Sequence, residues 1–417
     1  MKAIKLALHW QMFIALILGV VGGWALGGCF SVWGNFIHGV GNLFLHAINM
    51  IVIPLVFLST LLGISTMSNS KAMGRIAVKT FLYFITTAFV AAIVGISVTD
   101  IIRPGYGARE AHIQAEEIIT NAEQAGSTTL MDRIVDIIPS NIFEAFASGD
   151  ILPIIFFSLM LGLFITKVQE ERQNTINVFF ESFHDVILRM TTFIIRFAPI
   201  GVFAIVMALV GGLTDDIEVL KSNFVSFAFF IIVVWISLIV MGGMILPVMV
   251  GLMAHVSPVK HLKQIYSALM VAFSTSSSYS ALPLIISDAR EKFGVSNNIA
   301  SFTVPLGITF NKIGTIIYEC VAVIFVAQAF DMELSAAQQI SLIGASIVTV
   351  LGAPSVPMAG VVVLAILLKS MNLPDTYIGM FMAVDILCDM PKTLLNAYSV
   401  SCSAIIVARS EGEELKI

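Results

Sequence analysis

Hydrophobic residues in this chain fall into long runs that contain no Asp, Glu, Lys or Arg. The longest, residues 6–70, is long enough for two helices joined by a turn near residues 27–41. Because a helix needs about 20 apolar residues to cross the hydrocarbon of a bilayer, such runs predict transmembrane helices. The others are residues 80–99, 151–166, 197–214, 222–259 and 334–368. The pattern predicts an all-α polytopic membrane protein.

Polar segments between the runs predict the topology. Residues 103–135 form the one long hydrophilic stretch and are expected outside the membrane, on the external side if three spans precede them. Five basic residues flank the first two predicted spans, and cytoplasmic loops carry an excess of such residues. They are Lys2, Lys5, Lys71, Arg75 and Lys79. We therefore expect a multi-pass protein of the plasma (inner) membrane, surrounded by lipid, with a cytoplasmic N-terminus.

Composition excludes several other classes of protein. Of the 417 residues, 58% are hydrophobic and 12% are charged, whereas a soluble domain carries about 25% charged residues. A large soluble enzyme is thereby excluded, and a net charge of -5 makes nucleic acid an unsuitable partner. The four cysteines stand singly in apolar sequence, without the spacing of a metal site, and we expect no cofactor.

Two polar interruptions lie at depths where lipid could not satisfy them. Residues 274–280 (STSSSYS) lie within the uncharged run 264–287, and residues 352–357 (GAPSVP) interrupt 334–368. Non-helical backbone at membrane depth is tolerated only where protein or a water-filled cavity receives it. Two such breaks predict a transporter with discontinuous helices around a central site. The alternative is that Pro354 and Pro357 only kink a spanning helix.

Ionisable residues inside the apolar segments are a further anomaly. Each costs roughly 2.5 kcal/mol or more at the centre of a membrane helix, so each needs a partner or a function. They are Lys312, Glu319, Asp385, Asp389 and Lys392.

One face of the last predicted helix gathers most of this polarity. At about 100° per residue, that face is about 100° wide. It carries Asp385, Asp389, Lys392, Thr393, Asn396 and Val400. Such a stripe predicts a binding site or an ion path. The alternative is an Asp389–Lys392 pair that only neutralises itself.

These groups suit a zwitterionic ligand. Asp389 can bind a substrate ammonium, and Lys392 can bind a carboxylate as a point charge. Backbone N–H groups and hydroxyls near Ser276 to Ser278 can hold a second carboxylate. The residues therefore predict a transporter for a small amino acid with two acidic groups, and they leave the substrate open.

Longer segments resemble the glutamate/neutral amino-acid transporter family, the dicarboxylate/amino acid:cation symporters. The resemblance covers nearly the whole chain, in the family's order. In the first half it rests on INMIVIPLVF (48–57), residues 136–165 and APIGVFA (198–204). In the second half it rests on AFSTSSSYSALP (272–283), SFTVPLGITFNKIGTIIYE (301–319), GAPSVPMAG (352–360) and DILCDMPKTLLN (385–396).

The resemblance implies a homotrimer of eight transmembrane helices and two re-entrant hairpins per protomer. A scaffold part would hold the trimer, and a transport part would carry substrate as an elevator does. By similarity, residues 1–74 are scaffold, 75–103 transport, and 104–217 extracellular loop and scaffold. Residues 218–417 are transport, with hairpins at about 260–292 and 336–372.

The family's binding residues carry over one at a time. Asp389 matches the residue that binds the substrate amine, and Thr393 with Asn396 matches the pair that holds the main-chain groups. The remaining matches, at the first hairpin tip and along the pocket wall, are Ser277, Ser278, Thr315, Val356 and Gly360.

Departures from the family concern the cations. Sodium-coupled members read Asn-Met-Asp-Gly-Thr where this chain has Asn311, Lys312, Ile313, Gly314 and Thr315. A second sodium-site carboxylate is Val400 here. Sodium prefers hard oxygen ligands, so we expect no bound metal and regard Lys312 as a substitute for its charge. Polar third-helix residues Tyr83, Thr86 and Thr87 do match the family.

The leading hypothesis is a sodium-independent transporter of aspartate or glutamate. Lys392 replaces the family's arginine, keeping the charge without the bidentate fork. Asn311, Lys312, Glu319 and Asp385 are the ion-coupling candidates, with Glu319 as a proton carrier. Alternatively, Glu319 stays neutral and hydrogen-bonded, or stays paired with Lys312.

Other functions stay open from the sequence. One alternative is a transporter or exchanger of neutral or sulfur-containing amino acids, with Lys392 turned onto Asp385 or Asp389. Another is an anion-leaking channel. A membrane enzyme is disfavoured, because no His lies near Ser277 to activate it.

Overall fold

The computed structural model describes most of the chain, and every regular element in that part is helical. The described residues are 8–26, 30–65, 71–107, 138–148, 151–212, 217–352, 359–371, 373–374 and 377–416.

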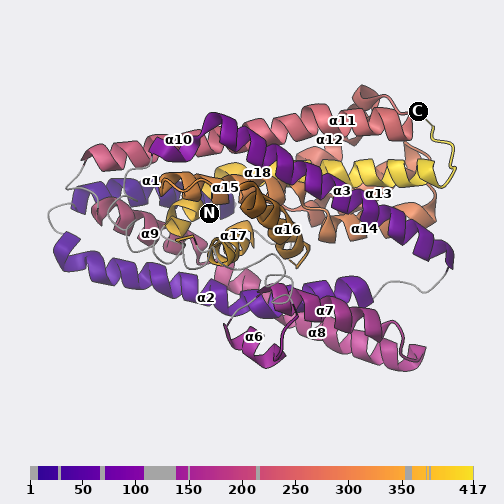
Figure 1. The fold of residues 1–417 in the computed structure, drawn as a ribbon, viewed down its shortest axis with the longest axis horizontal. Coiled ribbons are helices and arrows are strands. Elements are labelled where there is room, and N and C mark those ends of the chain that lie inside the picture. The colour runs from indigo at the N-terminus through magenta and orange to yellow at the C-terminus, as the bar shows by residue number, and fades with distance from the viewer. Residues whose placement is uncertain are drawn as a thin grey trace, which may run out of the picture.

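The helices of the described residues are shown in chain order in Figure 1. The first half contains α1 (Leu8–Leu26), α2 (Phe30–Ser65), α3 (Lys71–Ile102), the 3-10 turn η2 (Pro104–Gly107), α6 (Ile142–Ser148), α7 (Ile151–Ile165), α8 (Glu170–Ile195) and α9 (Ala198–Gly212). The second half contains α10 (Ile217–Val240), the π-turns η4 (Met241–Ile245) and η5 (Val250–Ala254) around α11 (Leu246–Met249), α12 (Pro258–Thr275), α13 (Ser278–Glu291), α14 (Asn297–Phe310), α15 (Ile313–Ala329), α16 (Ala336–Gly352), α17 (Ala359–Ser370) and α18 (Ile378–Ser410).

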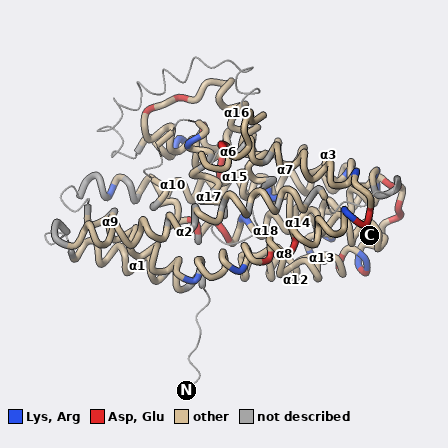
Figure 2. The backbone as a smooth tube through the Cα atoms, turned by 90° about the horizontal axis from the view of Figure 1, so that it is seen from below, with Lys and Arg blue, Asp and Glu red and all other residues tan. Residues whose placement is uncertain are grey.

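Several helices are suited to a bilayer. Among the described residues, three stretches are long and apolar enough to cross one: Gly74–Ile102, Val225–Ala254 and Asn297–Ala329. A bent pair, Glu170–Ile194 with Ala198–Ala208, would make a fourth. Figure 2 shows few charged residues along most helices and a concentration of them at the end that holds the C-terminus. The chain is thus an all-helical membrane protein, and the count of eight spans stays a prediction.

Packing divides the helices into two groups. In one, α2 packs against α7, α8 and α9, and α1 packs against α9. In the other, α3 packs against α15, and α18 contacts α12, α14 and α15. Helices α16 and α18 also contact the first group. In Figure 1, α2, α7 and α8 lie along the lower edge and α10 and α11 along the upper edge, with α15 and α18 between them.

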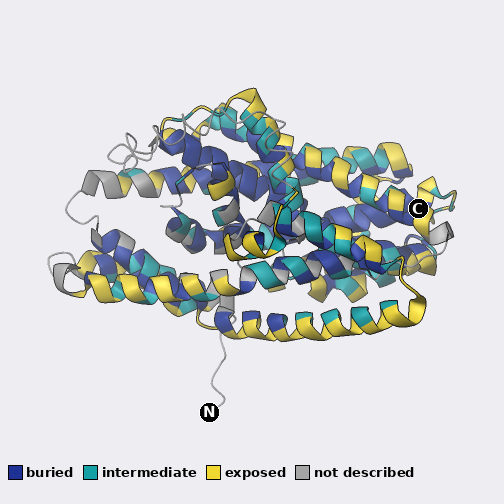
Figure 3. Ribbon diagram, turned by 60° about the horizontal axis from the view of Figure 1, so that its bottom comes forward, coloured by how far each residue is buried: buried dark blue, intermediate teal, exposed yellow. Residues whose placement is uncertain are grey.

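Helix α15 forms the centre of the core. All of its residues are buried except Thr315, which is partly exposed. Phe230 of α10 and Phe381 of α18 pack against its Phe325, with ring centroids 5.5 and 5.8 Å away. Figure 3 shows buried residues in the interior and exposed ones on the outer helix faces, as expected of helices that meet lipid.

The predicted interruption at residues 274–280 is a helix–turn–helix hairpin. Helix α12 ends at Thr275, and Ser276 has a left-handed backbone with φ 49°. Ser277 is extended and caps the start of α13. The second predicted interruption is flanked by α16 and α17, while residues 353–358, with Val356, Pro354 and Pro357, lie outside the described part.

The turn expected over residues 27–41 is shorter than the glycine pattern indicated. Helix α2 already begins at Phe30, so Gly34, Gly39 and Gly41 lie inside it. A Cβ at Gly41 would lie 2.9 Å from Ile205 of α9. This glycine therefore permits close packing of two helices, which a sequence pattern does not distinguish from a turn.

Candidate functional site

The break between α14 and α15 is seated directly on α18. A Cβ at Gly314 would lie 2.6 Å from the Lys392 carbonyl oxygen, so a side chain there would force the two backbones apart. The Gly314 N–H donates to Asn396 Oδ1 at 2.8 Å. Since the first N–H groups of a helix lack partners within it, Asn396 stabilises the start of α15. The chain is thus broken at Asn311 and Lys312, a break that the two polar interruptions of the sequence did not predict.

A buried charge cluster occupies the adjacent turns of α18. The Lys392 ammonium lies 2.5 Å from Asp385 Oδ1 and 3.5 Å from Asp389 Oδ1. It also lies 4.0 Å from the ring centroid of Tyr318 on α15, a cation–π contact. Lys392 and Asp385 are each 2% exposed. Two carboxylates and an aromatic face thus compensate one ammonium removed from water.

Asp389 is the more accessible of the two aspartates. Its side chain is 21% exposed, and the Ser276 side chain at the tip of the first hairpin interacts with its carboxylate. The simple Asp389–Lys392 pair considered from the sequence is therefore incomplete, because the nearer partner of Lys392 is Asp385. Asp389 is left facing the hairpin tip.

The other predicted pocket residues surround this cluster only in part. A Cβ at Gly360 would lie 3.4 Å from Lys392 Nζ and 3.7 Å from Thr315, so these three residues meet. Thr393 is buried beside Lys392 on α18. Ser278 is 7% exposed at the start of α13, and Ser277 is partly exposed. Val356 lies outside the described residues.

Two of the three polar residues of α3 that match the family, Tyr83 and Thr87, form hydrogen bonds inside the protein. Asn311 donates from Nδ2 to Ser399 Oγ at 2.8 Å and accepts at Oδ1 from Thr87 at 3.4 Å. Tyr83 donates to the Ser399 carbonyl at 3.2 Å. Thr86 faces outward and donates to the Leu82 carbonyl of its own helix.

Apolar side chains stand at the two positions where the family resemblance led us to expect sodium-site carboxylates. Ile313 and Val400 are fully buried. A Cβ at Gly307 would lie 3.0 Å from both Val400 methyl groups and 3.3 Å from Phe84. Among the described residues, no group of three or more His, Cys, Asp or Glu could hold a metal ion.

Glu319 is buried one turn deeper on α15 than Thr315. Its side chain is fully buried, and neither carboxylate oxygen has a hydrogen-bond partner in the part of the chain that the structure describes. Lys392 and Lys312 are the charged groups that act on it. A buried carboxylate without hydrogen-bond partners carries a large desolvation cost when it is ionised.

Three residues near the site were missed from the sequence. Ser399 follows Asn396 by three positions, so helical spacing could have indicated it. Tyr279 lies within the interruption 274–280 that the sequence indicated, without a role assigned to it, whereas Tyr318 carries no such signal. The Tyr318 ring lies below Lys392, and the Tyr279 hydroxyl at the first hairpin lies 3.3 Å from Thr309 of α14.

The comparisons with known proteins cover nearly the whole chain. The sequence profile of the sodium:dicarboxylate symporter family matches residues 8–410. The chain is 33% identical over 414 residues to the "Proton/sodium-glutamate symport protein" of Bacillus caldotenax, covering 98% of this chain and 96% of that protein.

Two other relatives carry different substrate names. The "Proton/glutamate-aspartate symporter" of Escherichia coli (strain K12) is 32% identical, over 99% of this chain and 94% of its own length. The "C4-dicarboxylate transport protein" of Bacillus subtilis (strain 168) is 31% identical, over 97% and 93%. With its helical bundle, broken helices and buried charge cluster, the chain belongs to the sodium:dicarboxylate symporter family and is a membrane transporter, not an enzyme.

Proposed function

We propose that the protein transports an acidic amino acid, aspartate or glutamate, across the plasma membrane. The observation that carries the proposal is Asp389, a partly exposed carboxylate between the hairpin tip and Lys392. A ligand with an amine complements this carboxylate, whereas a plain C4-dicarboxylate would bring like charge beside it. Two of the relatives named above are described as glutamate symporters.

Lys392 and Asn396 are suited to the two substrate carboxylates. A lysine ammonium has three N–H donors, and Asp385 and Asp389 account for two of them. The third can donate to the side-chain carboxylate of the substrate. Asn396 accepts from Gly314 through Oδ1, which leaves its NH₂ group to donate to the main-chain carboxylate.

Transport is proposed to be independent of sodium. Ile313 and Val400 offer no oxygen, and Asn311 and Thr87 bond to each other. A hard cation would meet methyl groups at these positions. The E. coli relative is named for the proton alone.

The proton is the proposed coupling ion, and Glu319 is its proposed carrier. Lys312 and Lys392 balance Asp385 and Asp389, so Glu319 holds the one unbalanced charge among these five groups. A proton on Glu319 would neutralise them together. Neutrality lowers the cost of moving the loaded site through a medium of low dielectric constant.

We propose that this chain has the scaffold and transport parts that the family resemblance implies. In a homotrimer, α3 and α10–α18 would form the transport part and move relative to the other helices. The two packing groups support this division.

Uptake into proteoliposomes tests the function. Labelled aspartate, glutamate and alanine are supplied in sodium or choline buffer, with and without an inward proton gradient. We expect aspartate or glutamate to accumulate equally in both buffers, and only with the gradient. A steep dependence on sodium would refute sodium independence, and failure of both acidic amino acids to enter would refute the substrate.

A neutral amino acid is the second candidate, favoured by one observation. Lys392 lies 2.5 Å from Asp385, so its charge is already compensated within the protein. If that contact persists with substrate bound, the pocket offers Asp389 for the amine and little for a second carboxylate. Saturable alanine uptake that excess aspartate does not inhibit would support this candidate over the first.

A further inference from the structure

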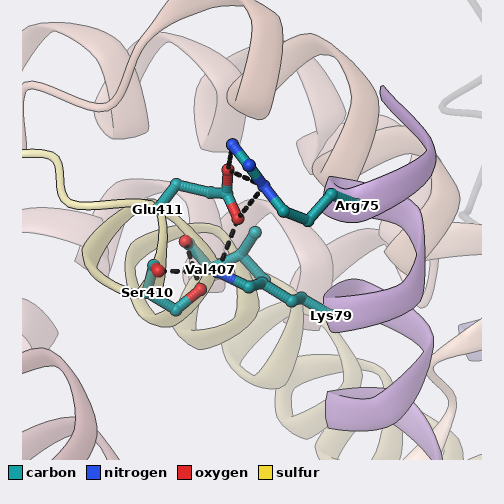
Figure 4. A network of polar contacts seen from close by, with 5 residues as sticks. All are labelled: Arg75, Lys79, Val407, Ser410 and Glu411. Carbon is teal, nitrogen blue, oxygen red and sulfur yellow. Dashed lines mark hydrogen bonds and ion pairs between the residues drawn. The ribbon is translucent and has the colours of Figure 1, made fainter. Parts of the chain in front are cut away.

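The last residues of the chain are bonded to several helices at once. The tail, defined here as residues 411–416, begins where α18 ends (Figure 4). Glu411 accepts from Arg75 Nε at 2.9 Å and Arg75 Nη2 at 2.6 Å, and its other oxygen lies 2.5 Å from Lys79 Nζ. Lys79 also donates to the Ser410 carbonyl at 2.6 Å. The end of α18 is thereby fixed to the start of α3.

The second half of the tail continues onto the base of the first hairpin. Glu413 accepts at 2.9 Å from the backbone N–H of Ser296, which caps α14. The backbone N–H of Lys416 donates to the Phe293 carbonyl at 3.0 Å. Gly294 directly follows Phe293 and has φ 76°. A Cβ on Gly294 would lie 2.9 Å from Cγ of Lys416, so the tail passes close to this backbone. These contacts hold the α13–α14 connection.

Burial separates these contacts from ordinary surface ion pairs. The Glu411 side chain is 8% exposed, although that of Arg75 is 67% exposed. Isolated exposed pairs contribute little, but a bidentate arginine within a network of several charges is the case in which they count. Backbone hydrogen bonds at both ends of the tail add positional constraint.

The elements joined by the tail are those that carry the transport site. Helix α13 carries the hairpin tip, α14 leads to the break at Asn311, and α18 carries Asp389 and Lys392. The tail meets all of these at their ends away from the pocket. A change in the angle between α13 and α18 would stretch the tail contacts.

We propose that the tail is a strap that holds the first hairpin closed on the transport site, with Glu411 as its positioning residue. The proposal rests on the transport role of this hairpin. When the strap is intact, α3, α14 and α18 move as one body and the tip opens rarely. When the strap is detached, the base of the hairpin is released and the tip opens more often.

Hydrogen–deuterium exchange of the full-length protein in nanodiscs tests the strap without any substrate. Glu411→Gln should speed exchange roughly two- to fivefold at the α13–α14 connection and at residues 276–280, with α9 unchanged. Glu414→Gln is the matched control, because it removes the same charge from an exposed position of the same tail and should change neither region.

A charge exchange separates the ion pair from a general effect of mutation. Because Glu411 also contacts Lys79, the charge exchange is made in the triple variant Arg75→Glu, Lys79→Gln, Glu411→Arg, and hydrogen exchange at the tip should return toward that of Lys79→Gln alone. If that variant does not fold, Arg75→Gln, which removes the other partner of the bidentate bond, should speed exchange at residues 276–280 as Glu411→Gln does.

Two results would overturn the proposal. Faster exchange confined to the tail, with residues 276–280 unchanged, would show that the tail is a passive end. Equal acceleration by Glu414→Gln would show that tail charge matters and the Arg75 contact does not. Because exchange is measured without substrate, a failure of the proposed substrate leaves this test intact.

Discussion

Replacing Lys392 with methionine removes the ammonium that faces both Asp385 and Asp389. Methionine keeps the length of the side chain, so the change is mainly one of charge. Asp385 is 2% exposed and would be left unpaired. Removing one partner of a buried ion pair costs about 3–5 kcal/mol, a large part of a total stability of about 5–15 kcal/mol. We expect the single variant to be severely destabilised.

The double variant Lys392→Met, Asp385→Asn separates structure from binding. Replacing a whole buried pair by neutral groups is often neutral for stability, so the thermal midpoint should return close to that of the parent. The bond from Lys392 to a substrate carboxylate would still be missing. A hydrogen bond to a charged group contributes about 1.5–3 kcal/mol, so affinity for aspartate should fall roughly 10- to 150-fold.

Calorimetry on the purified double variant measures both expectations with aspartate and with alanine. Alanine has no side-chain carboxylate, so its affinity should change little. If the stabilised double variant binds aspartate within about twofold of the parent, the reasoning is wrong and Lys392 is purely structural. The neutral amino acid would then be the better candidate.

Four further predictions test other parts of the site. Asp389→Asn should lower affinity for amino acids about 100-fold or more with the fold intact, and near-native affinity in calorimetry would show that Asp389 does not bind the substrate amine. Glu319→Gln should abolish accumulation driven by a proton gradient and spare exchange of labelled for unlabelled substrate; continued accumulation would exclude Glu319. Lys312→Met should weaken substrate binding unless another cation is supplied, and unchanged affinity in every salt would exclude a role for its charge. Hydrogen bonds from Arg75 and Lys79 hold the pKa of Glu411 below its usual 4.5, so the tail stays attached at neutral pH and detaches as pH falls through that lowered value. The rate at which pepsin cleaves the tail, divided by the rate for Glu411→Gln, should rise only in that acidic range. The same ratio at every pH would contradict this prediction.

One interruption of the hydrophobic pattern correctly predicted a break between helices. Serines inside an uncharged run predicted the hairpin tip, and the structure turns at Ser276 and Ser277. Polar atoms at membrane depth need partners from the protein, so their positions along the chain carry structural information. The break before α15 was not among the interruptions predicted in this way.

Distances across the bundle could not be obtained in that way. Helical spacing placed Lys392 beside both aspartates but could not select between them. Tyr318 and Gly360 come from other helices and confine the ammonium at the level of Asp385. Arg75 and Glu411 are 336 positions apart, and no local pattern connects them. Pairing between distant segments is determined by packing, which the sequence of one chain does not show.

The close packing of Gly307 against Val400 and Phe84 bears on how readily such a protein could change its coupling ion. A carboxylate introduced at position 400 would be surrounded by methyl groups and an aromatic edge, with little room for an ion or its water. Ile313 would also need replacement, and each step alone would bury an uncompensated charge. A sodium site built from carboxylates at these two positions would therefore take several coordinated substitutions, because each single step would be destabilising. In evolutionary terms, the packing around Val400 makes it difficult for a series of single substitutions to create a sodium site there.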